Sequence, residues 1–79
     1  MKTPRTISAE GLIKKLKVFG YEVTRQSGSH IRVTTIQNGE HHITIPNHDP
    51  IRKGTFSNIL NDVAFHFGKT KQEIINALF

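Results

Sequence analysis

The sequence contains no cysteine, which excludes a disulfide framework and a thiolate zinc site. No run approaches the roughly 20 apolar residues of a membrane-spanning helix, and the first residues, MKTPRTISAEG, lack the apolar stretch of a secretory signal. No P-loop, dinucleotide fingerprint, hydrolase elbow or paired-carboxylate motif is present. We therefore expect a cytoplasmic protein without a membrane partner, a cofactor or a metal.

Acidic residues are also few. Six Asp and Glu stand against eleven Lys and Arg, so the formal charge is +5 and the isoelectric point is near 10.0. This balance favours a polyanionic partner, which could be RNA, DNA or an acidic protein. The 79 residues are predicted to form one domain, 1–79, and a chain this short buries only about three-fifths of its unfolded surface. Any chemistry should therefore lie on the surface or in a shallow groove.

The segment SAEGLIKKLKVF, residues 8–19, has the periodicity of an amphipathic helix. Ser8 can accept a hydrogen bond as N-cap, and Gly20 suits the left-handed position that ends a helix. The apolar stripe consists of Leu12, Ile13, Leu16 and Phe19. Three lysines, Lys14, Lys15 and Lys17, lie off this stripe and are most simply read as its solvated face.

Three short segments with a period of two follow, around residues 21–26, 31–36 and 42–45, and they predict three consecutive strands. The connections QSGS and QNGE are short enough for hairpins. Pairing Val23 with Ile31 or Val33 on the helix-facing side requires an odd number of loop residues. We therefore expect three-residue loops with Gly28 or Gly39 in the left-handed conformation.

Two prolines make IPNHDPIRKG, residues 45–54, a crossing loop rather than a strand. Thr55 is then predicted as the N-cap of a second helix that ends at Gly68, and Thr70 with Glu73 has capping-box spacing for a short third helix. The order is helix, three antiparallel strands, helix, short helix. It predicts an α+β fold with the helices on one face of a three-stranded sheet.

Alternation along the strands predicts which side chains lie on the sheet face away from the helices. The predicted outer residues are Glu22, Thr24, Gln26, His30, Arg32, Thr34, His42 and Thr44. His30 is thus expected to be accessible. An isolated histidine on a surface can be a solvated side chain with no function, and this alternative stays open.

Two local features favour a functional histidine at this position. The small residues Ser27, Gly28 and Ser29 would let a phosphate approach the backbone N–H groups, and Arg25, Arg32 and Lys53 supply cations nearby. Imidazole can accept or donate a proton at neutral pH, as activation of an RNA 2′-hydroxyl requires.

The remaining histidines are weaker candidates. His41 and His42 are adjacent on a strand and should point to opposite faces, and His66 is expected to be exposed at the end of the second helix. His48 could reach His30 if its loop folds over the sheet. No set of His, Asp and Glu has a recognisable metal-ligand spacing.

The sequence resembles the HicA family of toxins, also called YcfA-like proteins. The resemblance covers nearly the whole chain through SAEGLIKKLKVFGYEV, RQSGSH, an Asn-Gly hairpin, ITIPNH and KGTFSNIL, in the family's order. The C-terminal FHFGKTKQEIINALF is longer than in minimal members, and GEHHITIP carries an additional histidine pair.

The resemblance implies a double-stranded-RNA-binding-domain-like fold. It also implies a ribosome-independent endoribonuclease that cleaves mRNA and is inhibited by a HicB-type antitoxin. His30 matches the family's catalytic histidine, Gly28 and Ser29 belong to the same element, and His48 and the segment 53–55 match other motif positions.

We therefore predict that His30 acts as general acid or base without a metal. The residues predicted to bind RNA are Arg25, Ser27, Gly28, Ser29, Arg32, His48, Lys53 and Thr55. A second acid or base could be His48, Lys53 or solvent. One alternative is a non-catalytic module that binds double-stranded RNA, and another is a protein-interaction domain with an acidic partner.

Overall fold

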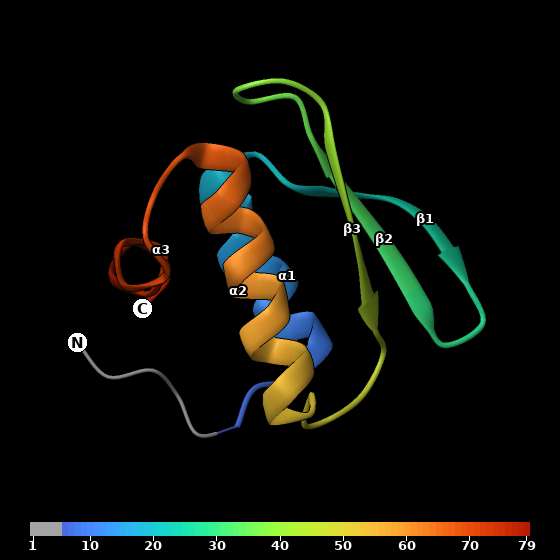
Figure 1. Cartoon of the computed structure of the whole chain (residues 1–79). Coiled ribbons are helices and arrows are strands. Elements are labelled where there is room, and N and C mark those ends of the chain that lie inside the picture. Colours follow the sequence, from blue (N-terminus) through green and yellow to red (C-terminus); the bar gives the residue numbers. More distant parts are fainter. Residues whose placement is uncertain (1–5) are drawn as a thin grey trace.

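The computed structural model of the protein describes residues 6–79. The chain forms α1 (Ala9–Leu16), the 3₁₀ turn η1 (Lys17–Phe19), β1 (Glu22–Ser27), β2 (His30–Thr35), β3 (His41–Pro46), α2 (Lys53–Phe67) and α3 (Lys71–Leu78). The strands form one antiparallel sheet in the order β1-β2-β3. All three helices lie on one side of this sheet, and α3 lies farthest from it (Figure 1). The predicted α+β fold with a double-stranded-RNA-binding-domain-like arrangement is confirmed.

Helix ends agree with the sequence signals at α1 and α3, and also at the end of α2, where Gly68 has the left-handed φ of 63°. Ser8 Oγ accepts a hydrogen bond from the Gly11 N–H at 3.0 Å, and Gly20 has the left-handed φ of 82°. Thr70 and Glu73 form the predicted capping box at α3. The hydrogen bonds that Thr70 donates from its backbone and side chain lower the pKa of the Glu73 carboxyl.

The start of α2 differs from the prediction. Arg52, not Thr55, is the N-cap residue, and the Phe56 N–H already donates to the Arg52 carbonyl at 2.9 Å. The buried Ile51 donates its N–H to the Ile7 carbonyl at 2.8 Å, which holds the chain where the helix begins. Thr55 therefore lies in the first turn, and no side chain caps this helix.

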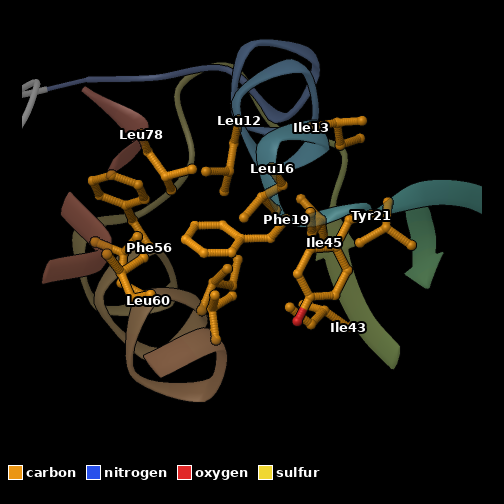
Figure 2. Packing of buried hydrophobic residues seen from close by; sticks show 14 of the residues in the cluster. Leu12, Ile13, Leu16, Phe19, Tyr21, Ile43, Ile45, Phe56, Leu60 and Leu78 are labelled. Atoms are coloured by element: carbon orange, nitrogen blue, oxygen red, sulfur yellow. The ribbon is translucent and has the colours of Figure 1, made fainter. Parts of the chain in front are cut away.

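The hydrophobic core lies between the sheet and the helices (Figure 2). Leu12 and Leu16 of α1 are fully buried, as are Val33 and Ile45 of the sheet. Full burial of each such side chain is worth about 1.5–3 kcal/mol. The core extends under α3 through Phe56, Leu60, Ile74 and Leu78, so the C-terminal segment completes the core as a structural element.

A β-bulge in β1 alters the predicted faces of that strand. Val23 lies opposite Val33, as expected, but Arg25 lies opposite Arg32 and Gln26 opposite Ile31. The extra residue, Thr24, shifts the alternation by one. Arg25 therefore joins the outer face, and Gln26 moves to the helix side, which corrects the predicted positions of both.

The bulge also explains why the first loop is shorter than predicted. Ser27 pairs with His30, so the hairpin loop is the two-residue Gly28-Ser29. Gly28 has the predicted left-handed φ of 59° and occupies the position where a type II′ turn favours glycine. The register needs an odd number of residues between the paired positions, and the bulge residue Thr24 provides the extra one in place of a third loop residue.

The second loop has the predicted odd count but comprises the five residues 36–40. It is fixed to the end of α2, because the Asn38 side chain donates to the His66 carbonyl at 2.8 Å. His66 Nε2 in turn donates to the carbonyls of Gln37 and Gly39, at 2.9 and 3.1 Å. His66 is therefore half-buried and not exposed as predicted.

Val23 faces the helix side but remains 49% exposed, so its predicted place in the core is wrong. It lies on the edge strand, where α1 does not close over the sheet. A groove of about 380 Å³ remains there, lined by Glu10, Ile13, Lys14, Lys17, Val23, Gln26, Ile31 and Asn47.

Candidate active site

His30 is presented by the tight turn between β1 and β2. It is the first residue of β2, its neighbours across the sheet are Ser27 and Pro46, and it is exposed. Because Ile31 is buried on the helix side, alternation places His30 on the outer face together with Arg32. The turn has only the small side chain of Ser29 and none at Gly28, so the backbone stays open to an approaching anion.

The crossing loop after β3 joins this turn to the helices. The Asn47 N–H donates to the Ser29 carbonyl at 2.6 Å, and the His48 carbonyl accepts from the Ala9 N–H at 3.0 Å. The loop thus connects the His30 turn, the start of α1 and the start of α2 at one end of the molecule, the lower end in Figure 1.

Three of the predicted RNA-binding residues lie on the crossing loop and on the start of α2. His48 is exposed in the crossing loop, and Lys53 and Thr55 lie in the first turn of α2. Within residues 6–79 no hydrogen bond joins the side chain of any of the three to His30. The structure therefore places these residues in the crossing loop and at the start of α2, and it forms no hydrogen bond between the His48 and His30 side chains in the described chain.

Arg25 and Arg32 lie directly opposite each other on the outer face, one strand apart. They line a hollow of about 460 Å³ together with Thr24, Thr34, Ile36, Glu40 and His42. Arg32 lies two positions after His30, about 6.6 Å along β2. The two arginines and His30 therefore share the outer face of the sheet.

The outer face also carries a chain of hydrogen bonds that the sequence reasoning did not find. Glu40 Oε2 lies 2.7 Å from His42 Nε2, His42 Nδ1 lies 2.7 Å from Thr34 Oγ1, and Thr34 Oγ1 lies 2.8 Å from Thr24 Oγ1. The sequence offered one sign of this chain. Glu40 stands two residues before His42, and the alternation of the strands places Thr24 and Thr34 on the same face as His42. The alternation did not show, however, that Glu40 of the loop reaches His42.

The helix side of the same strand holds a second histidine in a packed setting. His41 Nδ1 contacts the Tyr21 hydroxyl at 2.7 Å, and His41 Nε2 lies 3.2 Å from Asp62 Oδ1. The rings of His41 and His66 are stacked with centroids 4.4 Å apart. Burial, with the nearby charge of Asp62, raises the pKa of the Tyr21 hydroxyl far above its ordinary value. This cluster joins β3 to the buried Tyr21 and to the end of α2, and so supports the fold.

In the part of the chain that the structure describes, no group of three His, Asp or Glu side chains could hold a metal ion. In the same part, no helix is long and apolar enough to cross a membrane. The groups available for chemistry are thus an accessible imidazole, a set of cations and an exposed turn with open space at Gly28. This combination fits proton transfer at a phosphodiester.

Comparison with known proteins adds one finding. Residues 9–64 match a protein family described as the HicA toxin of bacterial toxin–antitoxin systems. The match includes α1, the whole sheet, the crossing loop and most of α2. No curated protein and no solved structure matches the chain.

Proposed function

The chain belongs to the HicA family of toxins of bacterial toxin–antitoxin systems, and from this premise we propose that it is an endoribonuclease that cleaves mRNA without the ribosome. The observation that carries the proposal is the exposed His30, presented by the Gly28-Ser29 turn beside two arginines and within the segment that matches the family. The cytoplasm, where mRNA is found, is its proposed location.

In the proposed reaction, His30 takes the proton from a ribose 2′-hydroxyl. The 2′-oxygen then attacks the neighbouring phosphorus, and the bond from phosphorus to the 5′-oxygen breaks. The leaving 5′-oxygen receives a proton from His48, Lys53 or water. Arg25, Arg32 and Lys53 hold the RNA backbone beside the reacting phosphate. No metal is required at any step.

The backbone of the turn supports substrate binding. Ser27, Gly28 and Ser29 leave room for a phosphate close to their N–H groups, and Lys53 and Thr55 add a cation and a hydroxyl at the same end of the molecule. A HicB-type antitoxin is the proposed protein partner. An acidic antitoxin surface would complement the net charge of +5 and would give a complex that weakens with salt.

The test uses purified wild-type protein, His30→Ala and a control, Lys69→Ala, which removes an exposed cation between α2 and α3. Loss of a general acid or base lowers the rate by about 10²–10⁴-fold, so we expect His30→Ala to lose nearly all cleavage of RNA. The control should keep it. Circular dichroism verifies that each variant is folded.

Two outcomes would decide against this function. Undiminished cleavage by folded His30→Ala would remove His30 from the reaction, and loss of wild-type cleavage in EDTA would require a metal. If the wild type binds RNA but cleaves none, the chain is a binding module of the same fold. Growth arrest and loss of bulk mRNA in bacteria should accompany induction of the wild type only.

A further inference from the structure

The hollow on the outer sheet face contains a pair of residues that lowers the stability of the sheet. Arg25 and Arg32 are directly opposed, and like charges at such positions destabilise a strand pair. Neither arginine forms an ion pair with a carboxylate among residues 6–79. The hollow thus holds two arginines without an ion-pair partner in the described chain, two threonine hydroxyls and the carboxylate of Glu40. Two cations against one carboxylate favour binding of an anion.

The hydrogen-bonded chain on this face has two possible directions. When His42 is neutral, Nε2–H donates to Glu40, Nδ1 accepts from the Thr34 hydroxyl, and Thr34 accepts from Thr24. When His42 is protonated, Nδ1–H donates to Thr34, and Thr34 donates to Thr24. The Thr24 hydroxyl hydrogen then no longer points to Thr34. Its other acceptor is the Arg32 carbonyl at 3.4 Å, a long hydrogen bond that a bound anion can replace.

We propose that Arg25, Arg32 and Thr24 form a second phosphate subsite for the RNA strand, and that Glu40, His42 and Thr34 are positioning residues that orient the Thr24 hydroxyl toward the phosphate. The inference rests on the proposed function in taking RNA as the molecule that carries the phosphate. Arg32 lies two residues along β2 from His30, so the subsite holds a phosphate next to the one that is cleaved.

The two partners of His42 fix the position of its ring. Glu40 Oε2 lies 2.7 Å from Nε2, and Thr34 Oγ1 lies 2.7 Å from Nδ1, so the ring cannot turn without losing both hydrogen bonds. The ring in turn holds the Thr34 hydroxyl, which contacts the Thr24 hydroxyl at the rim of the hollow.

The test measures fluorescence anisotropy of a labelled 2′-O-methyl RNA oligonucleotide, which lacks the free hydroxyl needed for cleavage. Thr24→Val removes the terminal donor and should weaken binding about tenfold. The matched control is Thr44→Val, which removes an exposed hydroxyl from the same face but outside the hollow. It should bind as the wild type does.

A second pair of variants separates the proposal from a simple effect of charge. Removal of any acidic residue strengthens binding to a polyanion if only the overall field matters. Glu10→Gln, on the exposed face of α1, should follow this rule. Glu40→Gln should instead weaken binding about threefold, because a neutral amide holds the His42 ring less firmly than the carboxylate does. His42→Gln should also weaken binding, because Thr34 loses the ring that orients its hydroxyl.

The outcomes also distinguish this inference from the proposed function. If the wild type cleaves RNA and His30→Ala does not, but Thr24→Val, Glu40→Gln and His42→Gln all bind as the wild type does, only the second subsite is wrong. Stronger binding by Glu40→Gln would likewise overturn it. If the wild type binds no RNA at any pH, the proposed function fails together with the subsite.

Discussion

His41 and His42 are consecutive residues of β3 whose side chains have opposite surroundings. The His41 side chain is 19% exposed and lies among Tyr21, Asp62 and His66, whereas the His42 side chain is 37% exposed at the edge of a hollow. Both rings have hydrogen-bond partners at both nitrogens. The two histidines differ in their surroundings: His41 is packed among other side chains, whereas His42 borders an open hollow.

The difference extends to the two faces of the sheet. On the helix side, each buried side-chain nitrogen or oxygen of residues 6–79 has a hydrogen-bond partner. On the outer face, Arg25 and Arg32 face each other with no carboxylate partner in the described chain. One face is therefore organised for stability, and the other keeps charges available for a ligand at some expense of stability.

The largest expected effect is the difference in stability between two variants, each of which lacks one of the two histidines. His41→Ala should lower the free energy of unfolding by about 1–3 kcal/mol, because it leaves the buried Tyr21 hydroxyl without its partner. His42→Ala should change stability by no more than about 0.5 kcal/mol, as is usual at a surface. Urea unfolding of both variants gives this comparison. Equal losses would mean that the outer chain also supports the fold.

A smaller effect concerns alkaline pH. The pKa of Tyr21 is raised in the folded protein by burial, whereas an unfolded tyrosine ionises near pH 10. The unfolded chain therefore loses this proton first, and stability falls as the pH rises above about 10. Tyr21→Phe should be about 1 kcal/mol less stable at pH 7, and the gap to the wild type should narrow above pH 10. If the difference in stability between Tyr21→Phe and the wild type stayed constant above pH 10, ionisation of Tyr21 would not account for the loss of stability.

The smallest expected effect has the opposite sign. Arg32→Thr removes the like-charge pair with Arg25 and should raise the free energy of unfolding by about 0.2–0.5 kcal/mol, while RNA binding becomes weaker. Thermal unfolding at low salt measures the first effect, which should shrink as salt is added. A loss of stability would show that the stem of Arg32 contributes more by packing than its charge costs.

Much of the fold was predictable because its signals are local. Ser8, Gly20 and the Thr70–Glu73 capping box act within one turn of their own helix. The alternation of β2 and β3 was read correctly, since Ile31, Val33, Ile43 and Ile45 are all buried. The accessible His30 followed from the same alternation.

The errors concern features that depend on distant contacts. The bulge at Thr24 exchanges the faces of Arg25 and Gln26, and the pattern of β1 alone does not show it. The start of α2 is set by the contact of Ile51 with Ile7 rather than by a capping side chain. His66 is half-buried because the loop of residues 36–40 folds onto the end of α2.

The amino-acid sequence by itself determined the order of elements, the apolar surfaces that form the core and the exposed turn that carries His30. These follow from periodicity and turn chemistry, which act over a few residues. Only the tertiary structure decided that Arg25 joins Arg32 and that Glu40, His42, Thr34 and Thr24 form one chain. Strand register and the bulge bring these residues together, and both are settled when three strands pair and pack as a unit.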